Sequence, residues 1–246
     1  MKKAEHMSII RHLEELRHRL MYVLGTLILV FIISFFFVSD IQLYLIRDFD
    51  RQLVLLGPVD ILWVYLSIAG VIAIILTMPV LAYHLWAYFS PALPKRLQRS
   101  SAVSIPLFLL LFLIGLSFGY FVVHPVVLSF LLKMGSQQMD IFFTAEKYYS
   151  FLFNMTVPFG FLFQLPLIIV FLTQMGVIHP QLLVKHRKLA YLILVIISVV
   201  ISPPDLISDL LIAVPLILLY ECSVVLSKWS LRRKKRAILE EMQNTQ

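Results

Sequence analysis

The chain has 246 residues, of which 60% are hydrophobic and 14% are charged, and its formal net charge is +7. Soluble domains carry about a quarter charged residues, so this composition excludes an ordinary soluble protein and indicates an integral membrane protein. A single cysteine, Cys222, excludes a disulfide framework and a cysteine-based metal site. The first apolar run, Leu20–Val38, does not end in small residues, so we expect it to remain as a span instead of being removed as a signal peptide.

The segment Ser8–Leu20 precedes this first span and is strongly charged. Its apolar residues recur at helical spacing and form one stripe: Ile9, Leu13, Leu16 and Leu20. On the polar side, Glu15 lies among Arg11, His18 and Arg19. One interpretation is a helix that pairs its own charges, each pair worth a few tenths of a kcal/mol. The other is a carboxylate held at the mouth of the membrane for a basic partner.

Six apolar segments are predicted to cross the membrane: residues 20–38, 61–89, 102–132, 151–175, 189–201 and 206–227. Of the 21 lysines and arginines, 17 lie in the odd-numbered polar parts between these segments and four in the even-numbered parts. The positive-inside rule then places both termini in the cytoplasm. Because the basic residues set topology, nucleic acid is not a predicted partner. We therefore expect an all-α fold in one integral membrane domain, 1–246, with a cytoplasmic amphipathic helix at 1–19, six spans over 20–227 and a frayed cytoplasmic tail at 228–246.

Some of these elements carry finer predictions. The loop 39–60 should hold a short helix on the membrane surface, and Pro79 should kink the second span. The fifth span has only 13 uncharged residues, near 20 Å of helix, which is short for a bilayer. The sixth is interrupted by three residues that disfavour an apolar helix: Asp209, Pro215 and Glu221.

Several polar residues lie within predicted spans. Ser117, between Gly115 and Gly119, matches the nucleophile elbow of serine hydrolases, but that motif needs a strand–turn–helix setting. A small-residue packing face is the better interpretation. Gln164, flanked by prolines, could bond a neighbouring helix or a loosened carbonyl of its own helix, or it could dock a partner. Glu221 should pair, be protonated or face the bundle interior, and we leave structural and functional roles open.

Five stretches together resemble the TatC family, the multi-spanning receptor subunit of the twin-arginine protein translocase. They are His12–Arg17, Trp86–Leu93, Phe118–Val122, Phe159–Gly160 with Phe163–Pro166, and Ser202–Asp205. The resemblance implies a glove-shaped bundle of six helices in the cell membrane, with short spans 5 and 6. It also implies recognition of twin-arginine signal peptides and, with TatA/TatB-type single-span subunits, export of folded proteins driven by the proton-motive force. It further implies self-association in the bilayer, no enzymatic activity, and no nucleotide, metal or other cofactor.

The resemblance also implies site residues. The family's first acidic contact with the signal peptide falls on Glu15, followed by Leu16 and Arg17. Gln98 stands where the family usually has a second glutamate, and Tyr88 where it usually has phenylalanine. For docking of partner subunits the resemblance points to Gln164, Asp205 and Glu221, with Gln164 in place of the family's mid-membrane glutamate. Two of these departures remove a charge, so Glu15 should dominate recognition and Gln98 support it through an uncharged hydrogen bond.

Two other classes of protein remain as alternatives. A proton-coupled transporter of a small solute would need a polar cluster at the membrane midplane, which Asn154, Gln164 and Glu221 could supply. An intramembrane protease would need a base beside Ser117, but His84 and His124 lie toward opposite membrane faces.

Overall fold

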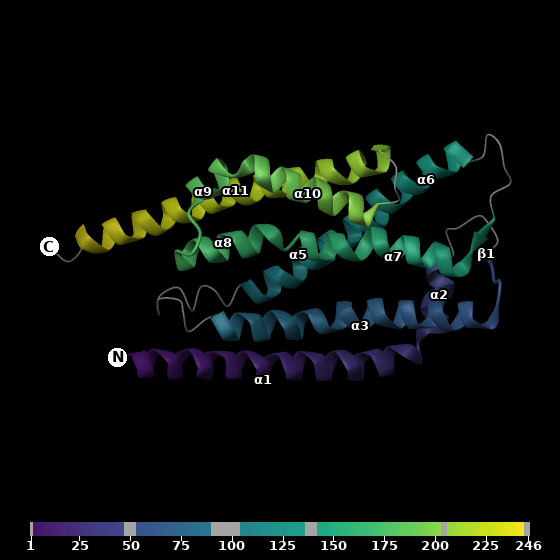
Figure 1. Cartoon of the computed structure of the whole chain (residues 1–246), viewed down its shortest axis with the longest axis horizontal. Helices are drawn as coiled ribbons and strands as arrows, with labels where there is room; N and C mark the ends of the chain where they lie inside the picture. Colours follow the sequence, from purple (N-terminus) through teal and green to yellow (C-terminus); the bar gives the residue numbers. More distant parts are fainter. Residues whose placement is uncertain (1, 47–52, 90–103, 136–141, 203–205, 244–246) are drawn as a thin grey trace. The chain divides into compact units, whose positions relative to one another are not determined.

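The computed structural model describes residues 2–46, 53–89, 104–135, 142–202 and 206–243, and the side chains from Glu14 to Arg232 within these ranges with few exceptions. The described chain is largely helical (Figure 1). It divides into two compact units. Unit 1 comprises Met1–Leu109 with Met139–Phe153, and unit 2 comprises Leu110–Gln138 with Asn154–Gln246.

Unit 1 is built on two long helices, α1 (Lys2–Phe35) and α3 (Pro58–Phe89), which pack along each other (Figure 1). Helix α1 continues without a break from the charged segment into the first span, as predicted. After a turn, α2 (Val38–Ile46) forms within the loop expected to hold a short helix and packs on α3, with Val38 fully buried.

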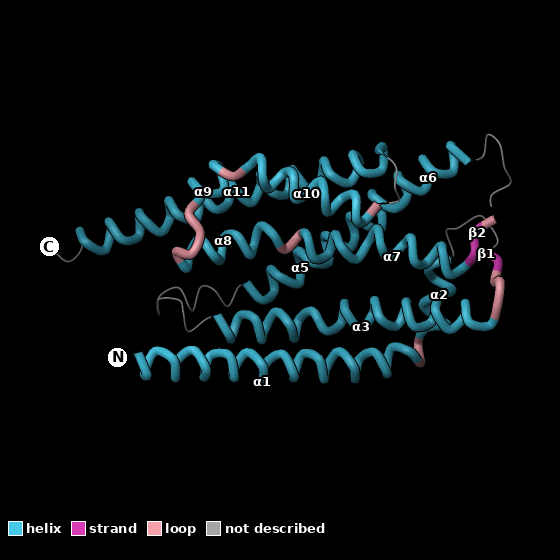
Figure 2. Tube along the Cα trace, viewed as in Figure 1, coloured by secondary structure: helices cyan, strands magenta, loops and turns pink. Residues whose placement is uncertain are grey.

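A small strand pair was not predicted by the all-α expectation. Strand β1 (Leu53–Val54) pairs in parallel with β2 (Phe143–Thr144), joining two loops that are far apart in the sequence (Figure 2). Asp60, in the first turn of α3, holds the turn after β1: its Oδ2 accepts hydrogen bonds from the backbone amides of Leu56 at 2.8 Å and Gly57 at 3.2 Å. Two-residue strands carry no alternation pattern, which is why the sequence did not reveal them.

The third span consists of α5 (Ser104–Phe118), a π-helical turn (Gly119–Val123) and α6 (His124–Gly135). The amide of His124 donates to the carbonyl of Gly119, one residue farther back than in an α-helix. This π-helical turn comes immediately before Pro125, which has no amide proton to donate. The backbone hydrogen bonds of the helix therefore change from α to π spacing at the point where Pro125 removes one of them.

Gly115 and Gly119 form the predicted small-residue packing face. A Cβ on Gly119 would lie 2.8 Å from the Cα of Thr156, and one on Gly115 would lie 2.8 Å from the Cβ of Phe163. Real Cβ atoms do not approach other carbons this closely, so only glycine allows this contact with the fourth span.

The fourth span is two helices, α7 (Ala145–Leu162) and α8 (Leu165–Met175), where the sequence predicted one (Figure 2). The break falls at Gln164, whose amide nitrogen pairs with the carbonyl of Phe161 instead of that of Gly160. Pro166, inside the first turn of α8, has no amide proton and cannot donate a hydrogen bond to the preceding turn. The loss of this hydrogen bond ends α7.

The remaining helices are α9 (Pro180–Lys185), α10 (Arg187–Ile201) and α11 (Leu206–Gln243). Helix α10 has 15 residues, about 22 Å of rise, so this segment is short, as predicted. The prediction for the sixth span was wrong: α11 runs for 38 residues through Pro215, and the tail expected to fray is helical to Gln243. Packing on α8 supports the continuous helix α11. Thr173 Oγ1 lies 2.7 Å from Ser227 Oγ, and Gln174 Nε2 donates to Ser230 Oγ at 3.2 Å.

Within the described residues, five segments are long and apolar enough to cross a membrane: Glu14–Phe35, Pro58–Tyr88, Ile105–Met134, Ala145–Met175 and Ile207–Arg232. Helix α10 is too short to join them. The last segment alone has 26 residues, so its length does not make it a short span.

Candidate functional site

Glu15 lies on α1 at the start of the candidate span Glu14–Phe35 and is paired within its own helix. Its Oε1 accepts hydrogen bonds from Arg19 Nε at 3.0 Å and Arg19 Nη2 at 2.6 Å. The side chain of Glu15 remains 40% exposed, and among the described residues its Oε2 has no partner. The local pair therefore leaves half of the carboxylate able to accept a second cation.

A group of aromatic rings joins α1 to α3 near the same end. The ring of Tyr22 stacks on the imidazole of His84, with centroids 5.9 Å apart, and Tyr83 meets His84 edge-on at 5.5 Å. Because Tyr88 follows His84 by four residues, it shares this face of α3 one turn closer to the helix end. The N-terminal part of α1 runs beside the C-terminal end of α3 (Figure 1). Glu15 precedes Tyr22 by two turns on α1, so it lies toward the same end of the helix pair as Tyr88.

The other predicted contacts either lie on other sides of α1 or fall outside the described residues. Leu16 is 38% exposed and Arg17 is exposed, each on a different side of α1 from Glu15. Gln98 and Asp205 lie outside the described residues.

The sequence indicated Arg19 as a neighbour of Glu15 but not the ring stack of Tyr22 and His84. The signal for Arg19 was its spacing of four residues. The stack depends on how α1 and α3 pack, and only the aromatic density of Tyr83–Tyr88 pointed toward it.

Gln164 is buried, with 2% of its surface exposed, and lies at the break between α7 and α8. Its side-chain Nε2 donates to the carbonyl of Gly160 at 3.4 Å. That carbonyl lost its usual partner when the backbone amide of Gln164 turned to Phe161. The structure thus contains the predicted bond between Gln164 and a loosened carbonyl of its own helix.

Glu221, the acid predicted to need a partner inside the last span, has two. Its Oε2 accepts from Arg187 Nη2 at 2.8 Å and its Oε1 from the hydroxyl of Tyr191 at 2.5 Å. Next to it on α11, the hydroxyl of Tyr220 donates to the carbonyl of Leu183 at 2.9 Å. These bonds tie α9 and α10 to α11. At the opposite end of the same hairpin, Ser202 Oγ donates to Asp209 Oδ1.

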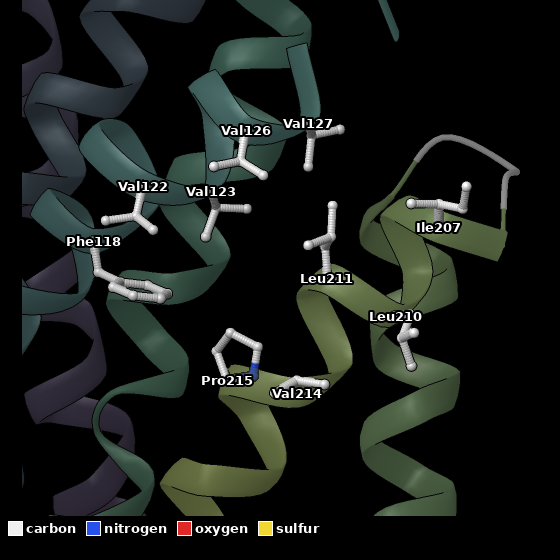
Figure 3. A pocket seen from close by; sticks show the side chains of 10 residues that line it. All are labelled: Phe118, Val122, Val123, Val126, Val127, Ile207, Leu210, Leu211, Val214 and Pro215. Atoms are coloured by element: carbon white, nitrogen blue, oxygen red, sulfur yellow. The ribbon is translucent and has the colours of Figure 1, made fainter. Parts of the chain in front are cut away.

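The polar cluster required by a solute transporter does not form in unit 2. Asn154 is exposed, Gln164 is buried at a helix break, and Glu221 is paired with α10. A cavity of about 430 Å³ between α5–α6 and α11 is lined only by apolar side chains (Figure 3). Its lining includes Phe118, Val122, Val126, Leu211 and Pro215. Sites for polar solutes contain a few convergent polar groups, which this lining lacks.

Ser117 does not have the setting of a catalytic nucleophile. It is exposed on α5, one residue before that helix passes into the π-helical turn. A nucleophile elbow needs a sharp strand-to-helix turn that presents the hydroxyl. The glycines around Ser117 serve helix packing instead.

The long apolar helices, with a carboxylate at one end of α1 and polar groups bonded inside the spans, define a multi-spanning membrane protein. A family model described as "Sec-independent protein translocase protein (TatC)" matches residues 11–215. The chain belongs to the TatC family and is a component of the Sec-independent protein translocase.

Individual relatives agree with this assignment. The chain is 46% identical over 235 residues to TatCd of Bacillus subtilis (strain 168), covering 96% of each chain. It is 39% identical over 240 residues to TatCy of the same organism, covering 96% of this chain and 94% of that one. A solved structure, "Crystal Structure of Twin Arginine Translocase Receptor- TatC", matches with a TM-score of 0.79 at 31% identity, covering 89% of this chain and 99% of that one.

Proposed function

We propose that this chain is the receptor subunit that recognises twin-arginine signal peptides, with Glu15 as its principal acceptor. The observation that carries the proposal is the half-used carboxylate of Glu15: Arg19 occupies Oε1, while Oε2 has no partner in the described part of the chain. Two adjacent guanidiniums present fork-shaped donors that are always charged, and a partly exposed carboxylate is their natural acceptor. A solved relative described as a twin-arginine translocase receptor supports the same role.

Around this acceptor we assign supporting contacts. Tyr88 lies at the same end of the α1–α3 pair and can pack an aromatic face against a guanidinium. Leu16 and Arg17 follow Glu15 on other sides of α1 and are proposed to contact other parts of the peptide, and Gln98 is proposed to supply an uncharged acceptor from the following loop. Because Gln98 lacks charge, binding should depend on Glu15 more than on the loop.

A binding measurement tests this site. A fluorescent peptide bearing Arg-Arg is titrated into the purified protein, with the Lys-Lys peptide as the ligand control. Glu15→Ala should abolish the preference for Arg-Arg, whereas Glu14→Gln, which removes an exposed charge one residue away, should leave it intact. If Glu15→Ala bound the Arg-Arg peptide as the wild type does, the proposal would be wrong.

The proposed topology has six spans, with α10 as a short fifth span and both termini in the cytoplasm. The support is the concentration of 17 of 21 basic residues in alternate polar parts. Cys222 is the single cysteine, so Cys222→Ser provides a background for labelling one introduced cysteine at a time. Cysteines near residues 5 and 240 should resist an impermeant reagent in intact cells, and one near residue 140 should react.

We further propose that TatA/TatB-type single-span subunits dock on this chain and that the proton-motive force drives export of folded proteins. Gln164, Asp205 and Glu221 are the proposed docking residues. Since both oxygens of Glu221 are engaged, its part is to hold α10 against α11 and so shape the surface offered to a partner. Complementation of a strain lacking its own receptor subunit, with reporters carrying Arg-Arg or Lys-Lys signals, tests the whole function.

A further inference from the structure

One end of the α9–α10–α11 group carries basic side chains that have no acidic partner among the described side chains. The last residues of α9 and the first of α10 lie against α11, because Tyr220 bonds Leu183 and Arg187 bonds Glu221. The charge of Arg187 is thereby neutralised. At this end Glu221 is the only acid among the described side chains, and it is already paired.

The cations that remain form what we call the basic collar: Lys185, Lys188, Lys228 and Arg232, all exposed. On α11, Lys228 and Arg232 follow Glu221 by seven and eleven residues, so at 100° per residue they lie on the face that carries Glu221. That face is the one that meets α9 and α10. Helices α9, α10 and α11 therefore each contribute exposed cations to this end of the group.

An apolar surface begins where the collar ends. Lys188 lies at the head of a stripe on α10 that continues at intervals of four, seven and eleven residues with Leu192, Val195 and Val199. These three side chains are exposed by 57%, 40% and 48%. Trp229, 52% exposed and next to Lys228, belongs to the residue type that prefers the membrane–water interface.

We propose that the basic collar binds the phosphate of an anionic phospholipid, whose acyl chain lies along the exposed stripe of α10. The charge of the collar complements a phosphate, and the stripe continues the collar directly into the lipid-facing surface of the protein. Basic pockets between transmembrane helices recognise anionic headgroups in this way. Neither an acidic peptide nor a nucleic acid would use the apolar stripe. This inference depends only on the chain being in a membrane, so it stands or falls separately from signal-peptide recognition.

Lipid retention by the purified full-length chain tests the proposal. Native mass spectrometry compares phosphatidylglycerol with phosphatidylcholine of the same acyl chains. The wild-type chain should retain phosphatidylglycerol about tenfold better, and Lys188→Gln should lower that preference about fivefold. The triple variant Lys185→Gln, Lys188→Gln, Lys228→Gln should abolish it, while the corresponding triple Lys→Arg variant should keep it.

Matched controls distinguish the collar from general charge effects. Lys147→Gln removes an exposed lysine from α7 and should change nothing. Millimolar inorganic phosphate should not displace the lipid, because a free anion makes no contact with the stripe. Equal retention of the two lipids, retention by the triple Gln variant, an equal loss with Lys147→Gln, or displacement by phosphate would each overturn the proposal. If the triple Gln variant does not fold, the lipid preference of Lys188→Gln alone tests the proposal, and an unchanged preference overturns it.

Discussion

Two glutamate–arginine pairs in the described part of the chain have similar geometry but differ in what they leave available. Glu15 and Arg19 are four residues apart on one helix, and among the described residues only one oxygen of this carboxylate has a partner. Glu221 and Arg187 are 34 residues apart on two helices, and Tyr191 takes the second oxygen. A local pair costs little to open, whereas the long-range pair holds α10 in place. The first therefore suits recognition and the second suits architecture.

The largest effect should come from breaking the long-range pair. Glu221→Gln leaves Arg187 without a counter-charge and should lower the free energy of unfolding by about 2 kcal/mol. This is less than the roughly 3–5 kcal/mol of a fully buried pair, because both side chains are about one-third exposed. Denaturation in detergent micelles measures it. A double-mutant cycle with Arg187→Gln should show coupling, and additive effects would mean that the two residues act independently.

Glu15→Gln should reverse this pattern, with a large effect on binding and a small one on stability. Losing one charge-assisted hydrogen bond should weaken binding of an Arg-Arg peptide about tenfold, or about 1.4 kcal/mol. The unfolding free energy should change by less than about 0.5 kcal/mol, because the lost ion pair is local and exposed. If instead the unfolding free energy fell and the affinity for the Arg-Arg peptide did not change, Glu15 would have a structural role like that of Glu221.

Restoring a charge at Gln98 should sharpen the role of Glu15. Gln98→Glu should tighten peptide binding about fivefold at about 0.01 M salt, where the Debye length is about 30 Å. The gain should shrink at about 0.5 M salt as screening increases. Titrations at both salt concentrations give the comparison, and no change at low salt would mean that this loop does not face the peptide.

The smallest effect should follow from releasing Glu15 from its own helix. Arg19→Gln removes a pair worth about 0.3–0.5 kcal/mol and frees Oε1, so Arg-Arg peptide affinity should rise about twofold. Lys147→Gln is the matched control, because it removes an exposed positive charge from α7, outside the proposed site. A fall in affinity with Arg19→Gln would show that Arg19 orients the carboxylate instead of competing for it.

Much of the helical framework followed from apolar length and spacing. The continuity of α1, the shortness of α10 and the packing of Gly115 and Gly119 were predicted because each depends on a local run of residue types. Two predictions about helix continuity were wrong. Pro215 and Glu221 were expected to interrupt the last span, but packing on α8 and the bonds of Glu221 to α10 support a continuous helix. Gln164, by contrast, broke a span expected to be whole.

The sequence alone therefore determined the membrane class, most of the helices, the family resemblance and the position of Glu15 before the first span. These rest on burial preferences and local spacing, which every short stretch of chain expresses by itself. Only the tertiary structure decided that Glu221 pairs with Arg187, that β1 meets β2, and that Tyr22 stacks on His84. Each of these joins residues more than 30 positions apart, and helix packing, which no local pattern encodes, chooses the partner.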